Sequence, residues 1–171
     1  GYAVTAKRVF IDVTERCRAV PCSVTASPID ITGLTFTIAT ISGARALTLG
    51  MGANVFELYY QFTLPSNFRK FAGLNTWALR ARYAKTSGTV NDSGTVLYDG
   101  AGNQLTLAAQ TGWTSATFAW REWNMAQIAA SPLTFAAGQL ISLAMNVDAN
   151  SGVLELQPQL QLRYIPQDGG F

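Results

Sequence analysis

Apolar and polar residues alternate most clearly near the end of the chain, in VLELQPQLQLRYIP, residues 153–166. One parity is apolar and consists of Leu154, Leu156, Pro158, Leu160, Leu162 and Tyr164. The other parity is polar and consists of Glu155, Gln157, Gln159, Gln161 and Arg163. A period of two predicts a β-strand with one buried face. A strand face that meets only water usually carries several charges. This row of three amides is therefore either a contact with another surface or a neutral face exposed to solvent.

The same alternation predicts short strands along the whole chain. They fall in residues 9–13, 17–24, 34–41, 46–49, 54–64, 76–84, 94–107, 116–123 and 131–147. Turn-forming residues gather in residues 85–94 and 148–152, which predicts an exposed loop and a turn, and DGAGN at residues 99–103 predicts the turn of a hairpin. Residues 65–73 predict a helical turn or loop. The pattern therefore predicts eight to ten short strands and no long helix.

This organisation predicts an all-β fold, an antiparallel β-sandwich. An eight-stranded jelly roll suits the strands and long connections better than an immunoglobulin-like domain, because the chain lacks a Cys, Trp, Cys spacing across two sheets. The predicted divisions are an extended N-terminal arm or edge strands at residues 1–33, the sandwich at residues 34–166 and a C-terminal tail at residues 167–171.

Charge is scarce in this sequence. Charged residues make up 13% of the chain, against about 25% in a typical soluble domain. The net charge of +2 is mild and the basic residues are scattered, so we expect no nucleic-acid partner. Residues 100–120 and 123–147 carry no charge, but polar residues, glycine or proline interrupt both segments. Neither predicts a membrane helix, and we expect no membrane partner.

The absence of histidine excludes Ser-His-Asp and Cys-His nucleophilic machinery. Glycoside hydrolysis needs only two carboxylates, but several of the ten acidic residues lie in turn sequences. Glu57 and Glu122 lie inside apolar strands, where each is positioned to pair with an arginine. The sequence therefore predicts neither enzymatic activity nor a cofactor.

Metal-binding patterns are equally weak. DGAGN and DANSG, residues 99–103 and 148–152, each supply one aspartate with no second acidic residue close by, so both predict turns rather than calcium sites. Without histidine, the two cysteines are too few for a usual zinc site. Cys17 and Cys22 flank Pro21, and either a disulfide or free thiols fit this spacing. We expect no metal site.

Aromatic residues outside the core would allow sugar binding, because a jelly roll can present flat rings that stack on pyranoses. The candidate sugar-stacking residues are Trp113, Trp123 and Tyr59. Trp120 and Trp123 have opposite parities, so at least one of them should lie outside the core. The alternative is that these rings cover the rim of the sandwich or pack at a subunit interface.

Three features form one recognisable combination. They are the scarcity of charge with the absence of histidine, a loose N-terminal segment, and the closing pattern LTFAAGQLISLAMNV followed by VLELQPQLQLRYI. It resembles the jelly-roll head decoration (cement) proteins of tailed bacteriophages and, more broadly, the single jelly-roll capsid proteins of viruses. The resemblance implies a non-enzymatic structural protein that forms a homo-oligomer, commonly a trimer. It also implies a place on the capsid surface of the virion, with the major capsid protein as partner.

Two hypotheses follow from the sequence. The first is a capsid decoration protein whose candidate interface consists of Gln157, Gln159, Gln161, Arg163, Arg80 and Arg82. Glutamine suits such an interface because its amide hydrogen-bonds without the desolvation cost of a buried charge. The second is a carbohydrate-binding jelly-roll module, from a virion adhesin or a secreted protein, that uses the stacking residues instead.

Overall fold

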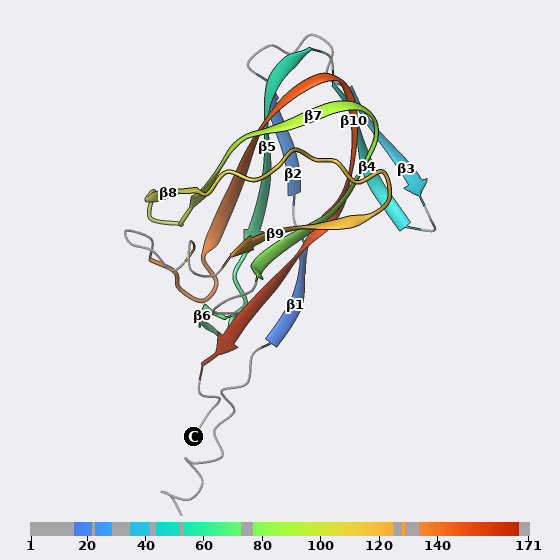
Figure 1. Ribbon diagram of the computed structural model, residues 1–171. Coiled ribbons are helices and arrows are strands. Elements are labelled where there is room, and N and C mark those ends of the chain that lie inside the picture. The colour runs from blue at the N-terminus through green and yellow to red at the C-terminus, as the bar shows by residue number, and fades with distance from the viewer. Residues whose placement is uncertain are drawn as a thin grey trace, which may run out of the picture.

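The computed structural model describes residues 16–21, 23–28, 35–41, 44–51, 53–72, 77–124, 128 and 134–167. Ten strands occur in these ranges, and they pair antiparallel in one continuous hydrogen-bonded network (Figure 1). Their bounds are β1 Arg16–Pro21, β2 Ser23–Pro28, β3 Thr35–Ile41, β4 Ala44–Met51, β5 Asn54–Thr63, β6 Phe68–Phe71, β7 Trp77–Tyr98, β8 Gln104–Leu107, β9 Ala119–Asn124 and β10 Leu140–Pro166. The same ranges contain no helix with the length and apolarity of a membrane span.

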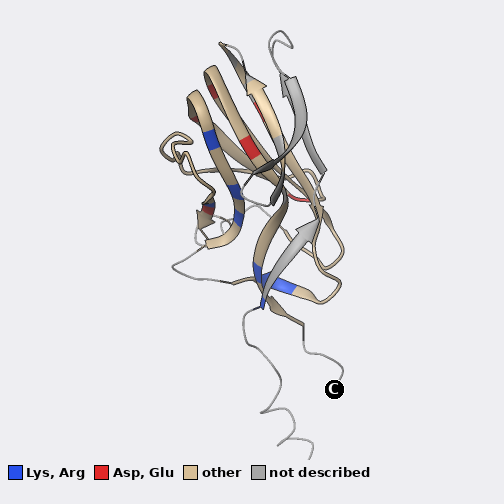
Figure 2. Cartoon of the chain, turned by 90° about the vertical axis from the view of Figure 1, so that its right-hand side faces the viewer, with Lys and Arg blue, Asp and Glu red and all other residues tan. Residues whose placement is uncertain are grey.

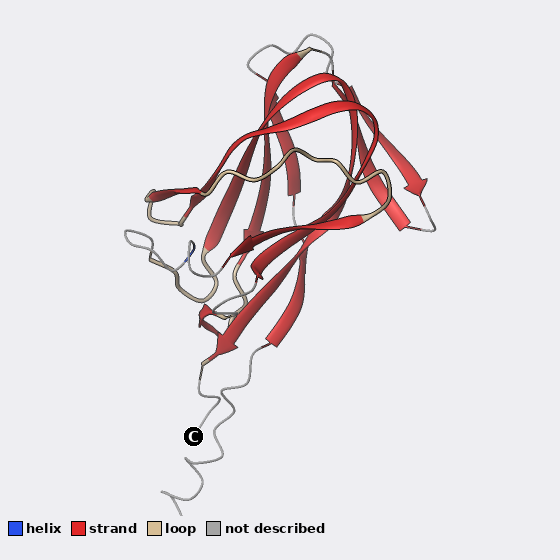
Figure 3. Ribbon diagram, viewed as in Figure 1, coloured by secondary structure: helices blue, strands red, loops and turns tan. Residues whose placement is uncertain are grey.

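Two long strands, β7 and β10, run through the whole domain and pair with each other from Tyr98 and Ser142 to Leu79 and Leu162. Around them the sheet folds into two layers. The first layer joins β2, β5 and β8 to residues 140–149 of β10 and 90–98 of β7. The second layer joins β1, β3, β4, β6 and β9 to residues 152–166 of β10 and 77–87 of β7. The predicted antiparallel β-sandwich is confirmed, and red strands dominate Figure 3 accordingly.

Both long strands bend at one corner, where turn-forming residues of β7 and β10 meet. Gly88 has φ 63° and Ser151 has φ 52°, the left-handed region that favours glycine. A Cβ atom at Gly88 would overlap the backbone carbonyl of Ser151, so no other residue fits without a shift. The pairing register also slips between Asn150 and Val153, as it does at a β-bulge.

The exposed loop predicted at residues 85–94 and the turn predicted at residues 148–152 are both wrong. Both segments are strand throughout, because their glycine and serine residues bend two paired strands together instead of reversing the chain. The prediction at residues 65–73 is corrected as well, since Phe68–Phe71 forms the short strand β6 against β10. The DGAGN hairpin is confirmed, because Thr95–Tyr98 of β7 pairs with Gln104–Leu107 of β8.

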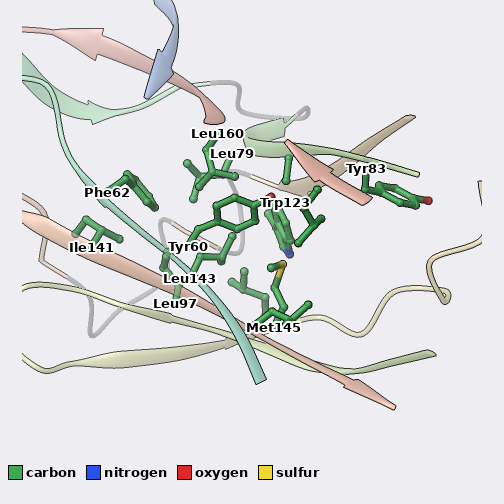
Figure 4. Close-up of a cluster of buried hydrophobic side chains, with 14 of the residues drawn as sticks. Tyr60, Phe62, Leu79, Tyr83, Leu97, Trp123, Ile141, Leu143, Met145 and Leu160 are labelled. Carbon is green, nitrogen blue, oxygen red and sulfur yellow. The ribbon is translucent and has the colours of Figure 1, made fainter. Parts of the chain in front are cut away.

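The core lies between the two layers and follows the predicted alternation. Five of the apolar parity residues of β10 are at most 3% exposed: Leu154, Leu156, Leu160, Leu162 and Tyr164. From the first layer, Tyr60, Phe62 and Leu143 meet Leu79 and Leu160 of the second, as Figure 4 shows. Full burial of such a side chain stabilises the fold by roughly 1.5–3 kcal/mol relative to exposure, so this alternation is the main reason for the sandwich.

The connection between β8 and β9 has no regular structure, but hydrogen bonds and an ion pair involving a buried arginine hold it against the sandwich. The side chain of Trp113 is 1% exposed, and its backbone N–H donates to the Val90 carbonyl at 2.9 Å. Arg121 donates through Nη1 to the Thr111 carbonyl at 2.7 Å, and its Nη2 lies 3.4 Å from Oδ2 of the buried Asp92. Burial lowers the pKa of Arg121, and the Asp92 carboxylate opposes that shift.

Candidate functional site

The outer face of the first layer is hollowed into a groove of about 330 Å³. We call it the tyrosine groove. It is lined by Glu57, Tyr59, Gln61, Tyr98, Ser142 and Ala144. Three neighbouring strands, β5, β10 and β7, therefore contribute to one surface.

The register of these strands explains the groove. Ser142 of β10 pairs with Gln61 on one side and with Tyr98 on the other, while Ala144 pairs with Tyr59. Residues paired directly across a sheet point to the same face. Two tyrosines consequently stand on strands that are about 10 Å apart, one on each side of β10. Between them the floor consists of the small residues Ser142 and Ala144, which leave the space open.

The polar chemistry of the tyrosine groove is mixed and almost uncharged. Glu57 supplies a carboxylate, Ser142 a hydroxyl and the tyrosines two phenol groups. The Gln61 Nε2 donates to the Ser142 Oγ at 3.2 Å, so these two side chains are already held relative to each other. No lysine or arginine is present among the described residues that line the groove. The groove thus offers both donors and acceptors but no cation for an anionic ligand.

The outer face of the second layer carries a row in which guanidinium groups and aromatic rings alternate. We call it the arginine ladder. Its members, in order, are Arg163, Trp77, Arg80, Trp120, Arg82 and Phe118. The Cζ of Arg80 lies 4.0 Å from the ring centre of Trp77 and 4.1 Å from that of Trp120. These separations are within the range of favourable cation–π contacts.

Pairing between strands places the ladder residues side by side. Arg82 lies opposite Trp120 across β7 and β9, and Arg80 lies opposite both Glu122 and Gln161. Arg80 donates through Nε to the Oε1 of Gln161 at 2.7 Å, and its Nη1 lies 3.6 Å from the Oε2 of Glu122. Arg80 is therefore held from both neighbouring strands while it contacts two indole rings.

Four of the six candidate interface residues come together on this face. Arg80, Arg82 and Arg163 belong to the ladder, and Gln161 hydrogen-bonds to Arg80. Figure 2 shows the described Lys and Arg residues on several strands of the domain.

Gln157 and Gln159 do not continue this row. The register between β10 and β7 slips between Leu156 and Leu160, around Pro158, which has no N–H for the sheet. The Gln157 carbonyl accepts a hydrogen bond from the Tyr60 hydroxyl at 2.9 Å, and Gln159 is exposed. The predicted row of three amides is thus interrupted by a bulge.

Sequence reasoning missed Trp77, Phe118 and Trp120 as partners of the arginines. The shared parity of Phe118 and Trp120 was a usable signal, because it places them on one face of the strand predicted at residues 116–123. Trp77 gave no such signal, since its parity predicted the core. A register slip between Trp77 and Leu79 lets its ring lie against Arg80 on the outer face instead.

The three predicted sugar-stacking residues lie in different environments. Tyr59 lines the tyrosine groove, where it is accompanied by Tyr98, which sequence reasoning did not select. Trp113 and Trp123 are each 1% exposed, so neither presents a ring face to a ligand and the stacking prediction is corrected for both. The ring centre of the buried Trp113 lies 4.4 Å from the Cζ of Arg121. The Trp123 indole points towards Met145 in the core (Figure 4). One member of the Trp120 and Trp123 pair lies outside the core as expected, but it is Trp120, at 36% exposed, and not the selected Trp123.

The aspartates of the two predicted turns, Asp99 and Asp148, differ in burial. Asp99 is buried and accepts hydrogen bonds from the backbone N–H groups of Ala101, Asn103 and Thr134. The Thr134 bond is the largest cause of a pKa for Asp99 well below its usual range. Asp148 lies on β10 near the corner and is exposed. Within the described ranges, no three His, Cys, Asp or Glu side chains gather around a common point.

Cys22 and the side chain of Cys17 lie outside the residues that the structure describes. The alternatives of a disulfide and of free thiols therefore stand as the sequence left them.

Comparisons with known proteins give fold similarity only. No protein family matches the sequence, and no curated protein matches it. Among solved structures, the family 11 carbohydrate-binding module from Clostridium thermocellum in complex with a β-1,3-1,4-mixed-linked tetrasaccharide is 9% identical, with a TM-score of 0.49 over 87% of this chain and 98% of that chain. TmCBM61 in complex with β-1,4-galactotriose is 15% identical, with a TM-score of 0.44 over 84% and 88%.

A domain of a viral protein also shares similarity with the chain. The enzymatically active domain of bacteriophage CBA120 tailspike protein 4 is 9% identical, with a TM-score of 0.44 over 90% of this chain and 20% of that chain. At these identities and TM-scores, none of the three similarities assigns a ligand or a functional residue to this protein.

Proposed function

We propose that this protein is a non-catalytic carbohydrate-binding module whose ligand is a neutral glycan held in the tyrosine groove. The observation that carries the proposal is the placement of Tyr59 and Tyr98 on opposite sides of a hollow floored by Ser142 and Ala144. Ligand sites typically combine aromatic walls with a few convergent polar groups, and this groove has that composition.

A sugar fits the groove better than an apolar ligand does. The apolar faces of a pyranose pack on aromatic rings, while its hydroxyls donate and accept hydrogen bonds. Glu57, Gln61 and Ser142 provide acceptors and donors beside the rings. Glu57 would repel an acidic sugar, and the described lining has no cation to offset that repulsion. The ligand is therefore neutral, and its binding should change little with salt.

Binding to a panel of neutral polysaccharides tests this proposal. Affinity electrophoresis in gels containing mixed-linkage β-glucan, galactan or mannan measures retardation without a labelled ligand. We expect at least one of these polymers to retard the protein, and we expect Tyr59→Ala and Tyr98→Ala to weaken that binding by roughly 30-fold each, the size of a central aromatic contact. Tyr59→Phe, which keeps the ring, and Arg82→Gln, on the other face, are matched controls that should bind nearly as the wild type does.

Retardation by none of the neutral polymers would count against the proposal, and so would equal binding by the alanine variants and the wild type. Circular dichroism of each variant separates loss of the ring from loss of the fold. Because both tyrosine side chains lie on the outer face, the core should survive either substitution.

A structural virion protein is the second candidate. It is favoured by the gathering of Arg80, Arg82, Gln161 and Arg163 on one face beside the exposed ring of Trp120. In this role the protein would form a trimer and bind a major capsid protein through that face. Light scattering of the purified protein and co-sedimentation with expanded capsids test it. A monomer that leaves capsids bare would exclude this candidate and leave the glycan proposal untouched.

A further inference from the structure

The arginine ladder has chemistry that the tyrosine groove lacks. Three guanidinium groups lie in one row, and within the described part of the chain the carboxylate of Glu122 lies beside them. Glu122 pairs with the central Arg80, and the three guanidinium groups outnumber this described carboxylate, so the row has an excess of positive charge. Arg82 contacts the rings of Phe118 and Trp120, and a ring leaves the in-plane N–H donors of a stacked guanidinium available. The row therefore presents mainly hydrogen-bond donors and positive charge.

The ring faces in the ladder are already in use. Trp77 contacts both Arg80 and Arg163, and Trp120 contacts both Arg80 and Arg82. A pyranose or a nucleic-acid base needs an open aromatic face for stacking. Because guanidinium groups already pack on both indoles, a ligand that stacks on these rings would compete with the arginines. What remains for a ligand is the edge of the row, with its N–H groups.

We propose that the arginine ladder is a second binding site, which takes a linear acidic polysaccharide through its sulfate or carboxylate groups. Guanidinium groups pair with such oxyanions in a planar, two-point geometry, and stacking on the indoles fixes their planes in advance. Each guanidinium is separated from the next by one aromatic ring, so the donors recur along a line. A linear polymer with regularly spaced charges matches this line better than the curved surface of a folded acidic protein does.

This site does not depend on the proposed function of the tyrosine groove. The ladder lies on the second layer and carries positive charge, whereas the groove lies on the first layer and contains Glu57. The two ligands differ in charge, and binding to them should differ in salt dependence. Failure at one site therefore leaves the other site testable.

Titration with dextran sulfate and with polygalacturonate tests the ladder, and unsubstituted dextran serves as the neutral control. The full chain is titrated calorimetrically between about 50 and 200 mM salt, a range over which polyanion affinity falls steeply. We expect the wild type to bind at least one of the two polyanions and to lose affinity as salt increases. The Arg82→Gln, Arg163→Gln double variant should bind at least tenfold more weakly, with a salt slope smaller by about two.

Two further variants separate the ladder from general electrostatic attraction. The Arg69→Gln, Lys85→Gln variant loses the same charge outside the ladder and should bind within about twofold of the wild type, since those residues make no ladder contact. The Arg82→Lys, Arg163→Lys variant keeps the charge but loses the planar groups, and it should retain the salt slope while binding more weakly.

Several results would overturn the proposal. One is a wild type that binds neither polyanion at low salt, and another is an equal loss in the ladder and control variants. Tighter binding to single-stranded DNA than to either polysaccharide at the same salt would assign the ladder to a different polymer. A changed oligomer mass in the ladder variant, with polyanion binding intact, would make the ladder a contact between copies of this chain.

Discussion

The two outer faces of this sandwich share the strands β7 and β10 and yet have opposite chemistry. Residues 90–98 of β7 and 140–149 of β10 carry the tyrosine groove, with Glu57 as its charged member. Residues 77–87 of β7 and 153–166 of β10 carry the arginine ladder. The backbone pairing is alike on both sides of the corner at Gly88 and Ser151. The difference therefore comes from the outward residues and from the neighbouring strands, β5 beside the groove and β9 beside the ladder. It shows how one strand pair can support two different surfaces.

The largest expected effect comes from the buried pair that holds both layers together. Arg121→Met should destabilise the protein by about 3–5 kcal/mol, because it leaves the buried Asp92 carboxylate without its cation and releases the Thr111 carbonyl. Urea denaturation followed by tryptophan fluorescence measures the change. A loss below about 1 kcal/mol would show that the connection from β8 to β9 is not pinned by this pair.

The second largest loss of stability is expected from a substitution at the corner where β7 and β10 bend. Gly88→Ala should destabilise the fold by about 2 kcal/mol, since a left-handed backbone and a clash with the Ser151 carbonyl both oppose a Cβ atom there. Gly138→Ala is the matched control: Gly138 has φ 74°, close to that of Gly88, but a Cβ atom there meets nothing within 4 Å. If the two variants lose equal stability, the close approach of the two long strands does not matter.

A pH-dependent effect is expected at the hairpin beside the first layer. The folded pKa of Asp99 lies below its unfolded value, so this carboxylate stabilises the fold above the unfolded pKa and loses that contribution as the pH falls. Asp99→Asn should therefore be less stable than the wild type at pH 7, and the gap should narrow between about pH 5 and pH 2. Thermal melts over that range check the sign. A gap that stays constant would contradict the assigned pKa shift.

The smallest expected effect concerns the ladder. Arg80→Lys keeps the charge but loses the planar contacts with Trp77 and Trp120, and it should cost about 1 kcal/mol. The control Arg69→Lys replaces an exposed arginine on β6 and should be neutral. Chemical denaturation distinguishes the two. Equal stability of both variants would mean that the ladder contacts contribute nothing to the second layer.

Alternation predicted the core and the sandwich well, because burial of one strand face is a local property of the sequence. Leu154, Leu156, Leu160 and Leu162 lie inside as the period of two requires. The corner was not predictable in this way. The residues around Gly88 and Ser151 have the composition of loops, and only pairing between distant strands decides that they bend a strand instead of ending it.

The candidate sites were predictable only in part, for the same reason. Arg80 and Arg82 share a face in the sequence, but their aromatic partners come from β9 and from the register slip at Trp77. Tyr59 was identified because it faces away from the core of β5, whereas Tyr98 joins it only through the pairing of β7 with β10. Trp113 was misjudged because an irregular connection gave no parity from which to read its burial.

One set of measurements tests directly whether the two faces bind different polymers. Wild type, Tyr98→Ala and the Arg82→Gln, Arg163→Gln variant are each titrated with dextran sulfate and with the neutral polysaccharide that the wild type retains best. We expect Tyr98→Ala to bind the neutral polymer roughly 30-fold more weakly and to bind dextran sulfate as the wild type does. We expect the arginine variant to bind dextran sulfate more weakly and the neutral polymer as the wild type does. If either variant loses both polymers while remaining folded, or if neither loses any, the two faces are not separate binding sites and the account is wrong.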